Sequence, residues 1–357
     1  MKNAKLALGA ALVVLAGYSS TATAQQMIDL TIGASHPLAL PWIGMMQQYI
    51  QPEVNKRLAE QGNKYQIRWR EGYGGTLYKA NATLSSIGDG ITDIGWVFGS
   101  LEGSKLPLAQ VGNYTPGTTG NSGAVMEVVQ DLNDRMPSLQ REWAKNNVVF
   151  LSSTAIETLD LFTSFPVTKM DDLKGKKIGG AGTIGIVIAG AGGTAIDSPA
   201  PSMYNDISTG LMQGALTGAS IALSTKIYEV APYVTRVDMG SFAAGAIAMN
   251  KDRWEKMPPE VQGVIKAVSR DYSKRLSEAT NQRYEGWFKT MEAANKNVKV
   301  TVMSAAERER WIKALPNIAS DWVKASEAKG VPARQVLSTY MDSLRQRGVK
   351  PTRDWDK

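Results

Sequence analysis

Hydrophobic positions along the first 100 residues follow a repeating strand and helix pattern. Apolar residues alternate at 28, 30 and 32 and again at 65, 67 and 69, which predicts two half-buried strands. Between them, apolar residues recur at helical spacing from Trp42 to Leu58, and Pro52 is expected to kink or split this helix. A helix over 77–87 and a third strand over 91–98 follow. This βαβαβ order predicts a parallel sheet with right-handed crossovers.

A second series of the same kind begins after a buried strand at 148–151. Residues 171–173 predict a helical turn ended by Gly175, and 176–178 predict a short strand. A helix from 184 capped by Thr183, a strand over 193–196, a helix over 202–212 capped by Ser202, and a small-residue strand over 215–223 complete it. One or two strands over 233–250 are expected to return the chain to the first series.

A long helical pattern follows and reaches beyond one series. It opens at Pro258-Pro259 and keeps its apolar period as far as Ala294, which corresponds to about 50 Å at 1.5 Å per residue. We expect it to brace two lobes. A capping box at Ser304–Glu307 then opens the first of several C-terminal helices.

The predicted fold class is therefore α/β, a two-lobed clamshell like that of periplasmic binding proteins. Each lobe is a mixed, mostly parallel sheet flanked by helices, and the long helix bridges both. The first lobe is expected to hold 25–152 and 242–284, and the second 153–241 and 285–357 with a C-terminal helical tail. A ligand would lie at the carboxyl ends of strands from both lobes.

Residues 1–24 predict a cleaved signal peptide. Lys2 and Lys5 precede an apolar run over 6–17, and Ala22-Thr23-Ala24 is a cleavage site of the A-x-A type. No later run reaches the roughly 18 apolar residues of a membrane span. The sequence therefore predicts export to the periplasm.

Composition excludes most exported hydrolases. The chain has no cysteine and one histidine, His36, so disulfides, thiolate sites and multi-histidine metal sites cannot form. A histidine-based triad would need His36. The net charge is +7, but basic residues are interleaved with acids, and no nucleic-acid partner is expected. We expect no enzyme activity, cofactor or metal; capture of a small molecule is the natural function.

The ordered motifs carry a resemblance to a known family. DDLKGKKI, PAPSMYNDISTGLMQGALTG, YEVAPYV and AIAMNKDRWEKMPPEVQGVI, preceded by HPLALPW, GYGGTLY and GDGITDIGW, resemble the solute-binding proteins of TRAP transporters (tripartite ATP-independent periplasmic transporters). Residues 322–355 are similar to the extended tails of some members. The resemblance implies a two-lobed fold and delivery of a bound solute, in most members an organic acid, to a pair of permease subunits.

Two departures from the family bear on the ligand. The arginine that usually follows DLKGKKI and pairs with a ligand carboxylate is replaced by Gly179. Ser220 stands where many members have an acidic residue that in some holds a metal, so a metal is not expected. Other donors must replace the arginine, with Lys226 as the nearest cation, or the ligand is not a typical carboxylate.

The candidate binding residues come from both series. Aromatic residues near strand ends would wall an apolar or aromatic ligand, although aromatics at such spacing are more often core. The glycine loop would offer backbone donors near a helix start, and a bare tight turn is its alternative. Together the candidates are His36, Trp42, Tyr73, Tyr78, Trp96, Gly179, Gly180, Ala181, Gly182, Thr183, Ser202, Tyr204, Ser220 and Lys226.

The sequence thus predicts a periplasmic receptor of a TRAP transporter that binds an organic acid with an apolar or aromatic body. It is expected to be a monomer, with a dimer through the tail as the alternative. Two other functions stay open: a binding protein for a neutral or zwitterionic solute that serves an ABC importer or sensor, and an exported lyase or hydrolase.

Overall fold

The computed structural model describes residues 25–357, so the predicted signal peptide lies outside the described residues. Its first sheet has the order β2-β1-β3-β9-β4. β1 pairs in parallel with β2 and β3, and β9 pairs antiparallel with β3 and β4. The bounds are β1 Gln26–Gly33, β2 Tyr65–Gly72, β3 Ile94–Val97, β9 Ser241–Asn250 and β4 Val148–Thr163.

The second sheet continues from the far half of β4 through β7, β5 and β6. β5 is parallel to β6 and β7, whereas β4 is antiparallel to β7 and β8. A last strand, β10, pairs in parallel with β8. The bounds are β5 Lys177–Gly179, β6 Thr194–Ile196, β7 Gly214–Gly218, β8 Tyr233–Arg236 and β10 Lys299–Val302. β4 therefore belongs to both lobes.

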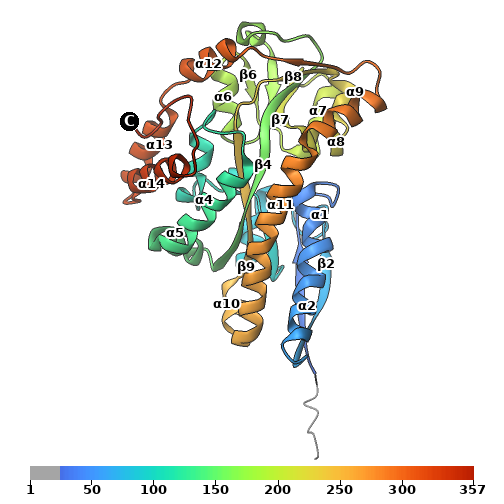
Figure 1. Cartoon of the computed structure of the whole chain (residues 1–357), viewed down its shortest axis with the longest axis vertical. Helices are drawn as coiled ribbons and strands as arrows, with labels where there is room; N and C mark the ends of the chain where they lie inside the picture. Colours follow the sequence, from blue (N-terminus) through green and yellow to red (C-terminus); the bar gives the residue numbers. More distant parts are fainter. Residues whose placement is uncertain (1–24) are drawn as a thin grey trace, which may run out of the picture.

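The long helix α11 runs from Pro259 to Ala294 and crosses both lobes, as the sequence predicts (Figure 1). Its buried face packs on β4, α4 and α8. The long helix α11 and the two mixed sheets confirm the predicted α/β fold class. The exact lobe boundaries stay a prediction.

Pro52 changes the helix in which it lies. The segment forms α1 (Pro41–Met45), a π-helical turn η1 (Met46–Ile50) and α2 (Gln51–Glu60). Proline has no backbone N–H to donate, so the helical bonding pattern is interrupted just before it. The expected break thus takes the form of a π turn.

The other helices flank the sheets or connect their strands. Their bounds are η2 Ala80–Ala82, α3 Thr83–Gly88, η3 Gly99–Leu101, η4 Leu108–Tyr114, α4 Ser122–Arg135, α5 Pro137–Lys145, η5 Met170–Leu173, α6 Ile184–Gly190, α7 Ala200–Ser208, α8 Ala219–Ser224, α9 Ile227–Val230 and α10 Lys251–Glu255.

Several local predictions were wrong. The strand expected over 215–223 ends at Gly218, and helix α8 begins at Ala219, where the buried Glu157 carboxylate accepts the Ser220 N–H. Thr183 makes no capping bond, and Ser202 lies inside α7, whose cap position is Pro199. Small and apolar residues are compatible with strand or helix, so the tertiary partner decides.

The C-terminal helices tie the two lobes together. α12 (Ala305–Ala314) places Trp311 against α6, where its indole donates to the Val187 carbonyl. α13 (Ile318–Glu327) and α14 (Ala333–Gln346) return to η4 and α4 of the first lobe. Trp355 is 2% exposed and donates to the Pro116 carbonyl, so the tail packs on its own chain.

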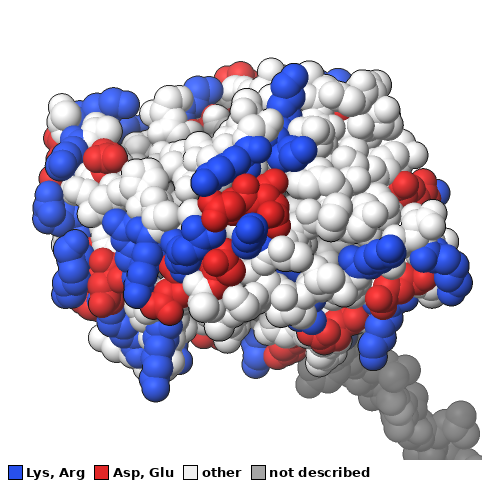
Figure 2. Space-filling model, turned by 90° about the horizontal axis from the view of Figure 1, so that it is seen from above, with Lys and Arg blue, Asp and Glu red and all other residues white. Residues whose placement is uncertain are grey.

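Charge and hydropathy of the described residues agree with the sequence analysis. None of the helices within 25–357 combines the length and apolar composition needed to cross a bilayer. Figure 2 shows basic and acidic side chains interspersed over the end of the molecule that holds the second lobe, with neutral surface between them. This face carries no continuous basic stripe.

Candidate functional site

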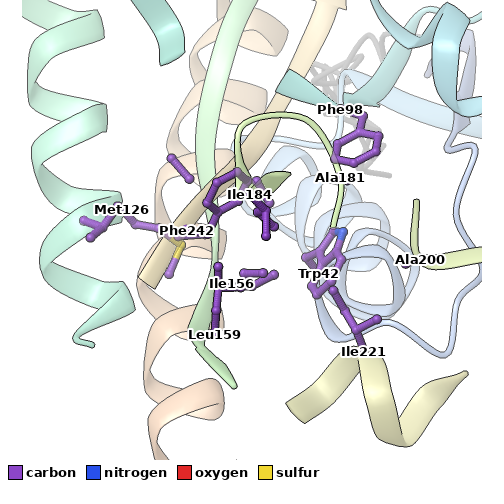
Figure 3. Packing of buried hydrophobic residues seen from close by; sticks show 14 of the residues in the cluster. Trp42, Phe98, Met126, Ile156, Leu159, Ala181, Ile184, Ala200, Ile221 and Phe242 are labelled. Atoms are coloured by element: carbon purple, nitrogen blue, oxygen red, sulfur yellow. The ribbon is translucent and has the colours of Figure 1, made fainter. Parts of the chain in front are cut away.

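A small cavity lies where the two lobes meet. Its volume is about 30 Å³, room for little more than a water molecule. Figure 3 shows how Trp42, Phe98, Ile184 and Phe242 approach it from separate elements. The lining residues are His36, Trp42, Trp96, Phe98, Ile156, Ala181, Ile184, Ala200, Met203, Thr217, Ile221, Phe242 and Ala244.

The lobes are closed over this cavity. The Ser224 hydroxyl of α8 donates to the Ala39 carbonyl beside α1 across 3.0 Å. The glycine loop lies against η3, since a Cβ on Gly182 would come within 2.7 Å of the Ser100 carbonyl oxygen. A solute of several heavy atoms therefore enters only if the lobes separate first.

Aromatic rings form the first-lobe wall. Trp96 is 1% exposed and stacks on Phe98, with ring centres 5.3 Å apart and planes 20° apart. Its indole donates to the Thr154 hydroxyl at 2.9 Å, so its ring is fixed in place by β4. Trp42 lies on the other side of Trp96 at 6.0 Å. Rings held in this way offer flat apolar surface to a ligand.

His36 lies in the same wall and is 1% exposed. Its ring meets Trp96 and Phe98 edge to face, at 4.8 and 5.2 Å. Ser35 Oγ lies 2.9 Å from His36 Nδ1, which leaves Nε2 for a ligand. Burial lowers the pKa of His36 to about 4, because a charged imidazole loses its hydration here. At neutral pH the cavity wall therefore holds a neutral histidine.

The remaining polar groups of the wall are neutral as well. Trp42 Nε1 is buried and makes no hydrogen bond within the described part of the chain. Buried donors without a partner are uncommon and costly, so this N–H is available to a ligand acceptor. Thr217 adds one hydroxyl. Among the lining residues, all within 25–357, there is neither a lysine nor an arginine.

The glycine loop contributes less to the cavity than its bare backbone suggests. Of Gly179, Gly180, Ala181, Gly182 and Thr183, the structure places Ala181 in the wall. A Cβ on Gly179 would lie 2.3 Å from the Met212 sulfur, so this methionine occupies the space of a side chain at 179. The Gly182 N–H is bound by the Asp197 carboxylate.

Several other predicted residues lie outside the wall. Tyr73 accepts a hydrogen bond from Gln51, and Tyr78 is buried behind β3 with its hydroxyl next to Gly95. Tyr204 is directed to Glu229 on the surface.

The remaining three predicted residues also face away from the cavity. Ser202 lies within α7, whose residues Ala200 and Met203 are the ones that reach the cavity. Ser220 is bonded to Glu157, and Lys226 is exposed with its ammonium 3.8 Å from Glu229. The first-lobe predictions that reach the wall are His36, Trp42 and Trp96.

The sequence analysis missed most of the second-lobe wall. Ile184, Met203 and Ile221 sit on helices as ordinary apolar positions, and nothing in their spacing marks them as exposed to a cleft. Phe98 directly follows β3, and Phe242 is the second residue of β9. Phe98 closes the motif ITDIGWVF, and its position directly after a strand was a usable signal.

A buried carboxylate on β4 lies behind the cavity and holds the start of α8. Glu157 follows the wall residue Ile156 on β4 and is 4% exposed. Its two oxygens bind the Ser220 N–H at 2.6 Å and the Ser220 hydroxyl at 3.0 Å. Burial raises its pKa to about 7. Thus Glu157 lies beside Ser220, the position at which the resemblance implies an acidic residue, but it is bonded to the start of α8 and does not line the interlobe cavity.

Larger hollows exist outside the interlobe cavity. One of about 600 Å³ opens behind β4 beside Tyr284 and Arg308, and its two arginines are paired within the protein, Arg308 with Asp238 and Arg236 with Glu285, while Glu157 in its lining is bonded to Ser220. Another of about 220 Å³ lies between α1, α8 and α11 and includes Arg283. The cavity between the lobes combines apolar rings with unused neutral donors, which the hollow behind β4 does not.

Two sheets that share β4, a helix that crosses both lobes and a cavity at their meeting edge define a two-lobed solute-binding protein. The model of the DctP family, bacterial extracellular solute-binding protein family 7, matches residues 50–325. The chain belongs to this family, whose members bind solutes and are not enzymes.

Similar proteins agree with this assignment. A solute-binding protein of Albidiferax ferrireducens is 24% identical over 216 residues, which cover 58% of this chain and 62% of that protein. A TRAP solute-binding protein from Rhodoferax ferrireducens, solved with copurified benzoate, has a TM-score of 0.79 at 19% identity and covers 90% of this chain and 98% of its own.

Two further solved structures have the same fold. A marine metagenome TRAP protein specific for aromatic acid ligands, solved with 3-hydroxybenzoate, has a TM-score of 0.78 at 18% identity, with 90% of this chain and 99% of that one covered. DctP7 of Bordetella pertussis, which binds pyroglutamic acid, has a TM-score of 0.73 at 18% identity, with 89% and 99% covered.

Proposed function

We propose that the protein is the periplasmic receptor of a TRAP transporter and binds a small organic acid with an aromatic or apolar body between its lobes. One observation carries the proposal: the interlobe wall is built from fixed aromatic and aliphatic side chains with a few neutral donors. Flat apolar walls favour ring-shaped ligands, and the donors orient one polar end.

Relatives of the same fold support this ligand class. The proteins solved with benzoate and 3-hydroxybenzoate hold aromatic acids, and others hold pyroglutamate. Membership in the DctP family supports transport as the role. In this account the closed lobes carry the solute to a membrane permease pair and reopen there.

The tail favours a receptor that acts as a monomer. The apolar face of α14, which includes Val336, Tyr340 and Leu344, is buried within the chain. A dimer through the tail would have to displace this packing. The predicted signal peptide would direct export, and the extracellular character of the family supports a receptor in the periplasm.

A neutral solute is the second candidate, because no lysine or arginine of residues 25–357 lines the cavity. Such a receptor would serve the same transporter class, an ABC importer or a sensor. The two candidate solutes differ in the charge of their polar end, which the neutral donors of the cavity wall must bind.

A thermal-shift experiment separates the two. The protein is refolded to remove any copurified solute and heated with benzoate, with benzamide or with benzyl alcohol. A ligand at 100 times its Kd stabilises the folded state by about 2.7 kcal/mol. The proposal expects benzoate to raise Tm more than its neutral analogues. If only the neutral compounds raise Tm, the second candidate holds; if none does, the cavity is not a site for aromatic solutes.

A further inference from the structure

A carboxylate entering the interlobe cavity meets no fixed positive charge. Among the lining residues the ionisable side chain is His36, and the polar groups Trp42 Nε1 and Thr217 are neutral. A carboxylate taken out of water without a counter-charge is strongly disfavoured. The positive counter-charge must therefore come from a lining residue that takes up a proton, from a cation of the solvent, or from a residue outside the wall.

We propose that His36 takes up one proton from solvent when a carboxylate enters, so that the receptor binds its acid as carboxylate and proton together. This inference rests on the proposed function, because it assumes a carboxylate ligand. The balance is simple: neutral imidazole, solvent proton and carboxylate become an imidazolium–carboxylate pair.

The geometry around His36 accommodates this change. Ser35 Oγ lies 2.9 Å from Nδ1, and a hydroxyl accepts from a protonated nitrogen as readily as it donates to a bare one. Nε2 is left to donate to the ligand. The rings of Trp96 and Phe98 lie edge to face with the imidazole at centroid distances of 4.8 and 5.2 Å, within the range at which an aromatic ring attracts a cation.

In the buried wall, before a carboxylate enters, the histidine is almost never charged. Burial lowers its pKa to about 4, so at pH 7 about one molecule in a thousand carries the proton. A carboxylate within hydrogen-bond distance favours the charged form and raises this pKa. Affinity is then highest at low pH and falls as the pH rises above about 4, until the pKa of the complex is passed.

Other titratable groups nearby do not replace His36. In the loop that packs against the backbone of His36, the Lys79 ammonium donates to the Gly75 carbonyl. Burial raises the pKa values of Tyr73 and Tyr78 in the same loop, so both stay neutral. The facing segments from β3, α1 and the second lobe bring apolar side chains. Behind β4, Glu157 titrates near neutral pH and is the group whose protonation must be separated from that of His36.

Arg283 is the rival source of charge. It lines the 220 Å³ hollow together with Ser220 and Gln48, and the Ser224–Ala39 contact between the lobes lies in the wall of the same hollow. A ligand that extends from one hollow into the other would place its carboxylate near this guanidinium. Such binding would need no proton.

Isothermal titration calorimetry with benzoate tests the proposal. Titrations at pH 7 in buffers of different ionisation enthalpy give the number of protons bound per ligand. We expect about one proton per benzoate, and a Kd that rises about tenfold from pH 6 to pH 7. Benzoate binding without proton uptake would overturn the inference and leave the proposed function standing; no binding of benzoate would instead refute the proposed function.

Three variants identify the group that is protonated. His36→Gln keeps a neutral hydrogen-bonding side chain and should abolish both the proton uptake and the pH dependence. Glu157→Gln is the control for the other buried group and should keep both. Uptake that survives His36→Gln would overturn the proposal. The proposal would also be overturned if the wild type takes up no proton and Arg283→Ala loses benzoate binding, because the arginine would then supply the positive charge.

Discussion

The buried carboxylate of Glu157 makes the stability of the folded protein dependent on pH. Burial raises its pKa from the ordinary value of 4.5 to about 7. The folded chain therefore keeps a proton that the unfolded chain loses between about pH 4.5 and 7, so the free energy of unfolding falls as the pH rises through this window. At 1.36 kcal/mol per pKa unit, the loss amounts to about 3 kcal/mol.

Replacing Glu157 by Gln should remove this loss. The amide matches the geometry, because its oxygen accepts the Ser220 N–H and its NH₂ donates to the Ser220 hydroxyl. We predict that Glu157→Gln gains up to about 3 kcal/mol at pH 8 relative to wild type, and gains little at pH 4.5. Urea denaturation followed by tryptophan fluorescence at both pH values measures the two differences.

Glu142 provides a matched control. It is also buried with a pKa raised to about 7, but its two oxygens accept the backbone N–H groups of Leu108 and Ala109. An amide can accept only one of them, and the unpaired donor costs about 1–3 kcal/mol. Glu142→Gln should therefore gain much less at pH 8. A Glu157→Gln variant whose pH profile parallels the wild type would refute the reasoning.

Three further predictions address the site and the tail. Trp42→Phe removes the unpaired indole N–H and should weaken benzoate binding about tenfold by calorimetry, whereas Trp143→Phe, whose indole is bonded to Asn133 away from the cavity, should not change it. Gly179→Ala should lower stability by about 1–3 kcal/mol because its Cβ meets the Met212 sulfur, and with Met212→Ala the combined loss should be smaller than the sum of the single losses. Trp355→Ala should cost about 3–5 kcal/mol in urea denaturation; no loss would mean that the tail is not docked.

The sequence predicts the architecture well because its signals are periodic and local. The period of α11 is sustained over Pro259–Ala294, and the strands over 26–33 and 65–72 alternate clearly. The strand that crosses between the lobes is harder to read. β4 is almost completely buried along its 16 residues, so it has no alternation, and only its first part is apparent in the sequence.

The cavity is predictable only where aromatic residues mark it. Trp42, Trp96 and His36 stand close to strand ends or loops and reach the wall. The residues that meet them from the second lobe are aliphatic, and their place depends on how the lobes close. The fate of Gly179 also depends on a distant residue, because Met212 fills its space.

A crystal structure of the mature chain with benzoate would locate the ligand itself. We predict one benzoate per chain between the lobes, with its ring against Trp96 and Phe98 and its carboxylate within hydrogen-bond distance of His36 Nε2 or Trp42 Nε1. A benzoate bound instead in the hollow behind β4, or a closed cavity that stays empty at saturating ligand, would contradict it.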